Sequence, residues 1–408
     1  MKKKHPLIAL FRNELGWMAA HVAILSLLSG CGAGGGSALD KKTGATNALN
    51  IADLGTTTLA TSPGVVSEAN YAYVPNHDSN QVVVFRMDEL SGELSYVGST
   101  PAGIGPVEVV IAPSGKHAYV PNGDSNNISI YEINPQNGSL VSIGLVASTG
   151  QWPLSLSIDA SGNFAYVANF VSNNISIFSI NHSTGTLKCI GDITTGINPR
   201  HIVLEPSGRY LYVANWGSSN ISIYSIDQNS GLLSQVGYPL NVAKSPFSIT
   251  SNRVGNRIYL TDFLSASGVK SVSLLNVDQS SGLLFDSGSG VSAGGHPMSL
   301  AFDPTGKFAY VPNSLNGLGG NSVSAFTVDS ATGVLGAIAC DCGQEGYPSG
   351  INPTAAVVDP TGSFLYVTNA TSNDIFVYSI SRPIGSLKLK YRVPSAGLYP
   401  MGISFGKW

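Results

Sequence analysis

A short aromatic and apolar segment recurs along the chain at a nearly constant interval. It reads YAYVPN at its first occurrence, YLYVAN in the middle of the chain and FLYVTN at its last. Each copy has a tyrosine at the third position, and the seven are Tyr73, Tyr119, Tyr166, Tyr212, Tyr259, Tyr310 and Tyr366. The intervals between them are 46, 47, 46, 47, 51 and 56 residues. A period of this length is typical of repeat architectures, so the sequence predicts seven copies of one unit.

Each unit contains signals for four short strands. In the last six copies a proline stands thirteen residues before the tyrosine, and a glycine that suits a tight hairpin turn lies between them. The tyrosine strand is followed by a strand such as NISIY, and another glycine turn leads to a fourth strand. This pattern predicts an all-β fold, a seven-bladed β-propeller with four antiparallel strands per blade, over residues 61–408.

The two ends of the repeat region complement each other. The first copy lacks the proline strand, whereas the sequence from Tyr399 onward matches that strand. We expect residues 401–405 to form the innermost strand of the blade that begins at Tyr71, because this closure removes two free sheet edges. Asparagines that end the tyrosine strands are interpreted as turn-forming residues: Asn76, Asn122, Asn169, Asn215, Asn313 and Asn369.

Composition excludes some classes of function. The 21 lysines and arginines face 24 acidic residues without forming a basic stripe, so nucleic acid is not an expected partner. No cysteine or histidine cluster has the spacing of zinc ligands, and we expect neither a metal site nor a cofactor. Within the repeats, Cys189, Cys340 and Cys342 leave the disulfide pairing open, and a Cys340–Cys342 bridge would have a strained spacing.

Residues 1–30 have the features of an export signal. Basic residues precede the apolar run MAAHVAILSLL, which is too short for a stable membrane span, and LSGC follows. LSGC resembles the lipobox of bacterial lipoproteins, which implies lipidation of Cys31 and a place in the bacterial cell envelope; a plain secretory signal is the alternative. Residues 31–60 are then the lipidated cysteine and a flexible tether. We expect a monomer that contacts the membrane through this anchor.

The repeat resembles two related groups of seven-bladed propellers, the bacterial YVTN-repeat proteins and the lactonases. Residues 366–369 spell YVTN, and the resemblance covers about residues 60–408. The lactonase group includes 6-phosphogluconolactonase-like enzymes and the fungal muconate cyclase. The resemblance therefore implies the propeller fold but leaves the function open.

The likeness to the lactonases is sharpest at the sequence PRH, residues 199–201. In that family the motif begins an inner strand, and its residues meet a glutamate, a second histidine and a second arginine at the mouth of the central channel. Arg200 and His201 match this motif and are the candidate catalytic residues. The resemblance implies that they act on a lactone carbonyl or carboxylate.

The other three family positions are not matched. Trp216 stands where the glutamate is expected, WPL at residues 152–154 lacks the second histidine, and Ser314 aligns with the second arginine. An arginine without acid–base partners can bind an anion but should hydrolyse an ester poorly. Whether the chain is an enzyme stays open at this point.

The repeat brings the starts of the first strands and the ends of the second strands to one face, around the axis. Residues at these positions are predicted to form a ligand-binding channel mouth beside Arg200 and His201: His77, Trp152, Phe170, Trp216, His296 and Tyr399. Aromatic rings stack on apolar sugar faces and arginine pairs with carboxylates, so the expected ligand is a sugar acid or a glycan fragment. The alternative is that these rings plug the channel as ordinary packing.

Three functions follow from these observations. The unmatched acid–base positions favour a membrane-anchored propeller that binds a carbohydrate-type ligand or a protein at the channel mouth. The PRH motif and the whole-chain likeness favour a lactone hydrolase similar to 6-phosphogluconolactonase. A muconate-type cyclase is favoured by the family resemblance alone.

Overall fold

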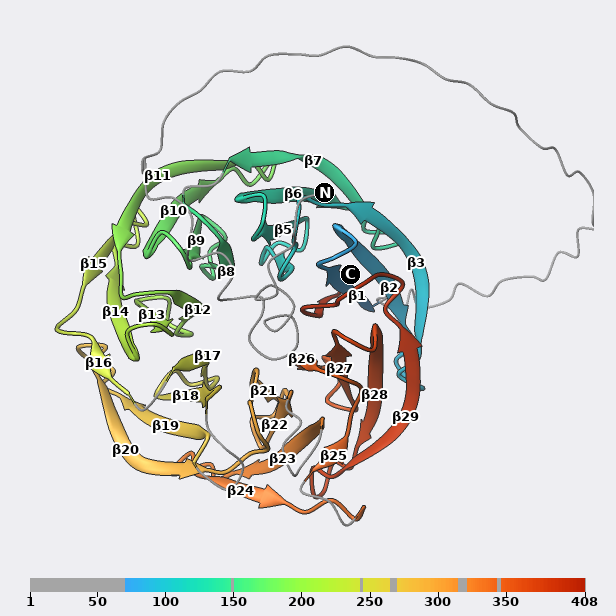
Figure 1. Cartoon of the computed structure of the whole chain (residues 1–408). Helices are drawn as coiled ribbons and strands as arrows, with labels where there is room; N and C mark the ends of the chain where they lie inside the picture. Colours follow the sequence, from blue (N-terminus) through green and yellow to red (C-terminus); the bar gives the residue numbers. More distant parts are fainter. Residues whose placement is uncertain are drawn as a thin grey trace, which may run out of the picture.

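The computed structural model describes residues 70–147, 150–242, 245–264, 270–314, 321–342 and 346–407. These residues form seven antiparallel sheets around a central axis, each with a path of four strands (Figure 1). The predicted seven-bladed, all-β propeller is therefore confirmed. The predicted export signal, Cys31 and the tether over residues 31–60 lie outside the described residues, as do residues 61–69 of the predicted propeller.

The two inner strands of each blade carry the proline and tyrosine segments of the repeat. In blade order, the innermost strands are β30 (Ser404–Lys407), β4 (Val110–Ile111), β8 (Pro153–Ile158), β12 (Pro199–Leu204), β17 (Pro246–Ser251), β21 (Ala301–Phe302) and β26 (Pro353–Val358). The second strands are β1 (Asn70–Asn76), β5 (His117–Asn122), β9 (Phe164–Asn169), β13 (Tyr210–Asn215), β18 (Arg257–Asp262), β22 (Phe308–Asn313) and β27 (Phe364–Asn369).

The two outer strands complete each sheet toward the circumference. The third strands are β2 (Gln81–Met87), β6 (Asn127–Ile133), β10 (Asn174–Ile180), β14 (Asn220–Ile226), β19 (Val272–Val277), β23 (Ser322–Val328) and β28 (Asp374–Ile380). The outermost strands are β3 (Leu94–Pro101), β7 (Leu140–Ala147), β11 (Leu187–Thr194), β15 (Leu233–Gln235) with β16 (Leu240–Asn241), β20 (Leu284–Val291), β24 (Leu335–Ile338) with β25 (Tyr347–Pro348), and β29 (Leu387–Pro394).

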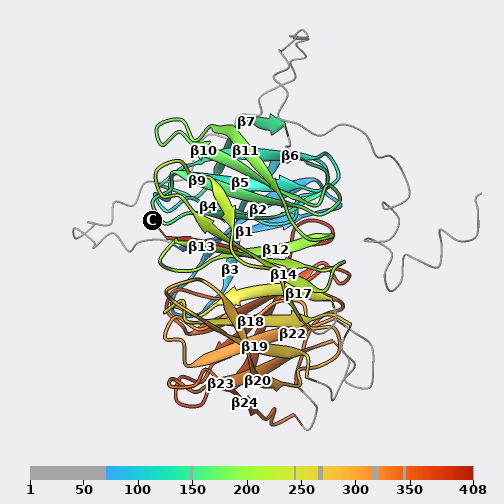
Figure 2. The same cartoon turned by 90° about the vertical axis from the view of Figure 1, so that its left-hand side faces the viewer.

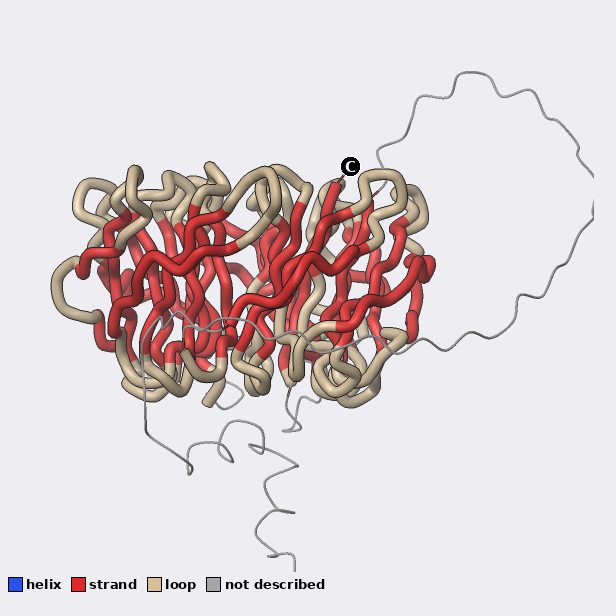
Figure 3. The backbone as a smooth tube through the Cα atoms, turned by 90° about the horizontal axis from the view of Figure 1, so that it is seen from above, coloured by secondary structure: helices blue, strands red, loops and turns tan. Residues whose placement is uncertain are grey.

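The molecule has the shape of a thick disc. Side views show the strands running through its thickness, with the loops gathered on the two flat faces (Figure 2, Figure 3). The middle strands are buried on both sides because a neighbouring blade covers each face, and every residue of β1 is buried. Within the described part of the chain, no helix is long and apolar enough to cross a lipid bilayer.

The recurring tyrosines join each blade to the next. The Tyr73 hydroxyl donates a hydrogen bond to the carbonyl of Gly138 (2.9 Å), in the outer hairpin turn of the following blade. The same bond recurs around the ring and ends with Tyr366 in blade 7, which donates to Gly92 in blade 1 (2.7 Å). Each hydroxyl is buried, so its partner offsets the cost of removing a polar group from water. The period of the sequence thus reflects a contact made seven times.

The C-terminal strand closes the ring, as expected from the sequence. β30 pairs with β1 in antiparallel register, with Ser404 opposite Tyr73, and an isolated bridge joins Pro400 to Asn76. The regular strand begins at Ser404, three residues later than predicted, because the backbone between these two pairings leaves the ladder. Blade 1 is therefore built from both ends of the repeat region.

The asparagines that end the tyrosine strands have a structural role. Asn169 donates hydrogen bonds to the side chains of Asn174 (3.0 Å) and Ser176 (2.8 Å) across the turn to the third strand. Asn215 repeats both contacts with Asn220 and Ser222. These buried bonds explain the recurrence of asparagine and agree with its interpretation as a turn residue.

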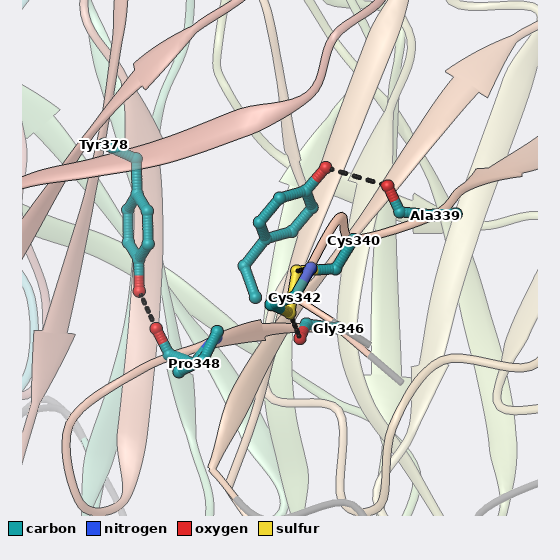
Figure 4. The surroundings of a disulfide bond; sticks show 7 residues. Ala339, Cys340, Cys342, Gly346, Pro348 and Tyr378 are labelled. Carbon is teal, nitrogen blue, oxygen red and sulfur yellow. Dashed lines mark hydrogen bonds between the residues drawn. A yellow bond between two sulfur atoms is a disulfide. The ribbon is translucent and has the colours of Figure 1, made fainter. Parts of the chain in front are cut away.

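A disulfide joins Cys340 to Cys342 in the connection between β24 and β25 (Figure 4). Just after it, the Pro348 carbonyl accepts a hydrogen bond from the Tyr378 hydroxyl of blade 7 (2.5 Å). The bridge therefore constrains a loop beside the contact between two blades. It lies on the outer part of blade 6 and not on the axis.

Candidate functional site

The innermost strands begin with a proline and a β-bulge. In β12, Pro199 pairs with Asn215 and His201 pairs with Ala214, so Arg200 is the extra residue. The same shift follows the first proline of β8, β17 and β26. A bulge sets two residues opposite one and re-aims their side chains, which explains why two consecutive residues of β12 both line the axis.

These strand starts surround a cavity of about 420 Å³ on the propeller axis, and all seven blades contribute to it. Three titratable side chains line it: Glu108 from blade 2, and Arg200 and His201 from blade 4. Most of the remaining side chains are apolar or carry a hydroxyl, including Leu154, Phe247, Met298, Ser299, Thr354 and Met401. A largely apolar, concave site with a few converging polar groups is the usual form of a small-molecule site.

Arg200 is nearly buried, with 8% of its surface exposed. Its guanidinium lies over the Phe247 ring, 4.3 Å from the centroid, and its Nε has no hydrogen-bond partner among the described residues. Burial lowers the pKa of Arg200 to about 10, and the nearby Glu108 opposes that shift. The side chain is still cationic at neutral pH and has a donor to offer an anion.

His201 faces the same cavity as a neutral ring. Its Nδ1 lies 3.1 Å from the carbonyl oxygen of Ile249, and a proton on Nδ1 donated to that oxygen leaves Nε2 as an acceptor. Burial, together with the charge of Arg200, lowers the pKa of His201 to about 4. Arg200 is thus the only cation at neutral pH among the described residues that line the cavity.

Glu108 is the functional candidate that the sequence interpretation missed. It stands two residues after Pro106, the position in blade 2 that His201 has in blade 4. One carboxylate oxygen accepts a short hydrogen bond from the backbone N–H of Leu156 in blade 3. Burial raises the pKa of Glu108 to about 7, although the Leu156 bond and the charge of Arg200 both oppose the shift. The sequence did contain a signal that could have identified Glu108, because no other blade has an acidic residue two positions after the proline.

Three of the predicted mouth residues pack on one another beside the cavity and are not part of its lining. The rings of Trp152 and Phe170 meet edge to face at 5.2 Å, and Phe170 lies 6.1 Å from Trp216. Phe170 is completely buried and Trp152 is 6% exposed, whereas Trp216 is half-buried. They form a cluster with Leu154 and Met401, both of which line the cavity. Ligand binding by these aromatic residues stays a prediction.

The other predicted mouth residues lie in pairs elsewhere around the rim. His77 meets Tyr399 at 6.2 Å, and its Nδ1 contacts Asp78 at 2.9 Å. His296 lies against Phe263 at 4.4 Å in blades 5 and 6. The structure therefore does not unite the predicted mouth residues into one site, and the described residues contain no group of three or more histidine, cysteine or acidic side chains able to hold a metal ion.

A ring of seven sheets around one cavity, with an arginine presented by an inner-strand bulge, defines a propeller with an axial site. The chain belongs to the family described as Lactonase, 7-bladed beta-propeller, whose model matches residues 54–151, 143–250 and 255–407.

Particular relatives share parts of the sequence. The 6-phosphogluconolactonase of Pectobacterium carotovorum is 30% identical over 107 residues, which is 25% of this chain and 30% of that protein. The 6-phosphogluconolactonase of Pectobacterium atrosepticum is 29% identical over the same length. The matched segment thus spans less than a third of either relative.

Solved structures share the fold over nearly their whole length. The periplasmic gluconolactonase of Pseudomonas aeruginosa superposes with a TM-score of 0.69 at 21% identity, covering 83% of this chain and 99% of that one. A Bacteroides fragilis protein, provisionally assigned as a 6-phosphogluconolactonase, has a TM-score of 0.74 at 21% identity, covering 84% and 99%. At such identities the likeness shows the fold alone.

Proposed function

We propose that this chain is a sugar-lactone hydrolase of the cell envelope that binds its substrate in the axial cavity. The observation that carries the proposal is the buried guanidinium of Arg200 in a cavity large enough for a small sugar derivative, with an Nε that no described residue engages. A buried donor without a partner is costly to keep, and an anionic ligand or a developing oxyanion would satisfy it. Membership of the lactonase family supports the same chemistry.

The lining suits the two faces of a sugar lactone. Apolar side chains such as Phe247 and Met298 can contact the ring, while the hydroxyl of Ser299 can bond to one of its substituents. The Ser299 hydroxyl has no hydrogen-bond partner among the described residues. The site thus offers the Ser299 hydroxyl and the Arg200 guanidinium as partners for the polar groups of a polyhydroxylated ring.

The charge of the cavity favours a lactone without a phosphate group. A phosphate monoester carries a charge of about −1.5 to −2 at neutral pH and is usually held by several cationic or backbone donors. Arg200 is the one cation available from the described lining residues at neutral pH, and Glu108 adds an acid. We therefore expect glucono-δ-lactone to be a better substrate than its 6-phosphate.

The proposal is tested by lactone turnover in purified protein lacking the first 31 residues. Hydrolysis of glucono-δ-lactone, corrected for the uncatalysed reaction, should be accelerated by the wild type. Arg200→Ala should lower kcat/KM by about 10²-fold or more, since removal of one donor to a developing oxyanion typically has that effect. The variant should also lose binding of gluconate, measured by calorimetry.

Arg209→Ala is the matched control, because Arg209 belongs to the same blade but is exposed and bonds to the Gln279 carbonyl (2.8 Å). It should keep wild-type turnover. A wild type that accelerates no lactone hydrolysis, or an Arg200→Ala variant as active as the control, would refute the proposed function.

We further propose that Cys31 is lipidated and anchors the propeller to a membrane of the bacterial cell envelope. The apolar run followed by LSGC supports this proposal. The full chain expressed in a bacterium should partition into the detergent phase, and Cys31→Ser should move it to the aqueous phase. Equal partitioning of the two proteins would count against the anchor.

A further inference from the structure

We propose that Glu108 is the catalytic residue that takes up and returns the proton when the lactone ring opens. The inference rests on the proposed function and adds the acid–base group that the lactonase positions of this chain lack. Trp216 stands where the family resemblance implies a glutamate, and Glu108 supplies a carboxylate from a different blade.

The position of Glu108 brings it to the substrate site. It lies in the part of the first strand of blade 2 between the isolated bridge at Pro106 and the regular pairing at Val110. Its side chain lines the same cavity as Arg200 and is half-buried. A ligand held by the guanidinium would therefore share the cavity with the carboxylate.

One oxygen of Glu108 is held and the other is available. The backbone N–H of Leu156 donates to Oε1, which orients the carboxylate. Among the described residues, no lysine, arginine or histidine lies within ion-pair distance of the Glu108 carboxylate. The ion pairs that these residues form both involve His77, with Asp78 and with Asp124. A half-buried carboxylate without a cation in contact contributes little to stability, which argues for a role in function.

Glu108 is a better proton acceptor than its neighbour His201. A general base works best when its pKa lies near the working pH. Burial raises the pKa of Glu108 to about 7, whereas burial and Arg200 lower that of His201 to about 4. Besides Glu108, the titratable groups that face the cavity from the described residues are Arg200 and His201. The pH dependence of catalysis is therefore set by the ionisation of these three groups.

The proposed reaction balances with water as the only co-reactant. The Glu108 carboxylate accepts a proton from a water molecule as the water oxygen bonds to the lactone carbonyl carbon. The negative charge that develops on the carbonyl oxygen faces Arg200. The bond from that carbon to the ring oxygen then breaks, and the Glu108 carboxyl gives its proton to the ring oxygen. The product is the open-chain hydroxy acid, which loses its acid proton to solvent.

The test compares Glu108→Gln with wild type and with Glu132→Gln, an exposed site in the same blade. Glutamine can still accept the Leu156 hydrogen bond but cannot take up a proton. Wild-type kcat/KM should rise with pH through about 7, as the base ionises. Glu108→Gln should be about 10²–10⁴-fold slower and should lack this rise, while Glu108→Asp should retain it at reduced activity. Glu132→Gln should match the wild type.

Measurements of stability and of gluconate binding distinguish a catalytic role of Glu108 from a structural one. Because the folded state holds the Glu108 proton more tightly than the unfolded chain, ionisation of this group lowers stability between pH 4.5 and about 7. Glu108→Gln removes that effect, so its melting temperature at pH 8 should not fall below the wild-type value. It should also bind gluconate at least as tightly as the wild type at pH 8, because a like charge is gone.

The outcomes distinguish this inference from the proposed function. Unchanged turnover in Glu108→Gln would overturn the role of Glu108 and leave the lactonase proposal standing. Loss of both turnover and gluconate binding would assign Glu108 to substrate binding and would also overturn the catalytic role. A wild type that hydrolyses no lactone would overturn both proposals together.

Discussion

At the residue scale, the positions before the first-strand prolines have an unusual backbone. Each adopts a positive φ, which is costly for a residue with a side chain: Gly105 (70°), Trp152 (59°), Asn198 (54°), Ser245 (47°), His296 (51°), Asn352 (59°) and Tyr399 (59°). In compensation, the backbone N–H of Trp152 donates to the Asn126 side chain of the preceding blade (2.7 Å). The bond recurs at Asn198 and Tyr399. The backbone conformation recurs at these positions because the backbone N–H links neighbouring blades, and this link does not depend on the side chain.

The two charged residues of the cavity influence each other without touching. The charge of Arg200 opposes the rise in the pKa of Glu108, and Glu108 opposes the fall in the pKa of Arg200, but burial outweighs both effects. A carboxyl that titrates near neutral pH in the same cavity as a cation suits the proposed hydrolysis of a lactone. The pH profile proposed for catalysis therefore depends on both of these groups, together with His201 in the same cavity.

At the scale of elements, β30 is the strand whose removal should lower the stability of the propeller most. β30 covers the inner edge of β1, and its Phe405 ring packs edge to face against Tyr366 of blade 7 at 5.0 Å. Ile403 is 8% exposed, and the Ser404 hydroxyl donates to the Val109 carbonyl of blade 2 (2.6 Å). One strand thus contacts three blades and also lines the cavity.

Deletion of residues 400–408 should destabilise the protein far more than loss of an ordinary tail. Removing three packed apolar side chains, Met401, Ile403 and Phe405, and opening a strand edge should lower the free energy of unfolding by about 5 kcal/mol. Thermal unfolding followed by circular dichroism measures the effect, with Tyr238→Ala, a change at a 93% exposed ring, as the neutral comparison. A truncated protein that melts at the wild-type temperature would contradict closure by β30.

The sequence was sufficient to predict the fold and two of the three titratable residues that line the axial cavity. The constant distance from proline to tyrosine and the period of the tyrosines predicted seven sheets and the closure of the ring. Both patterns arise from contacts that every blade repeats. The PRH motif predicted Arg200 and His201, which both line the cavity, and their catalytic role stays a prediction. Glu108 was missed because it lies outside the positions that the family resemblance supplied, although comparison of the second residue after each proline would have shown it. The packing of Phe170 against Trp216 is a contact between blades 3 and 4, which no single repeat encodes.

At the scale of the whole molecule, the site belongs to the ring and not to any one blade. Seven inner strands converge on the axis, and the tyrosine-to-glycine bonds fix each blade against the next. The cavity therefore combines residues from distant parts of the chain, such as Glu108 and Arg200, on a rigid scaffold. Rigid support of this kind is what a preorganised site requires, and it permits a carboxylate to come from any of the seven inner strands.

Binding of the product in the axial cavity is tested most directly by a crystal structure of the Glu108→Gln protein soaked with gluconate. We expect gluconate in the axial cavity, with its carboxylate bonded to the Arg200 guanidinium and with the substituted side chain at position 108 within reach of its C1 atom. Gluconate bound only at the rim, among Trp152, Trp216 or Tyr399, or an axial cavity that takes up no ligand at millimolar concentration, would contradict this expectation.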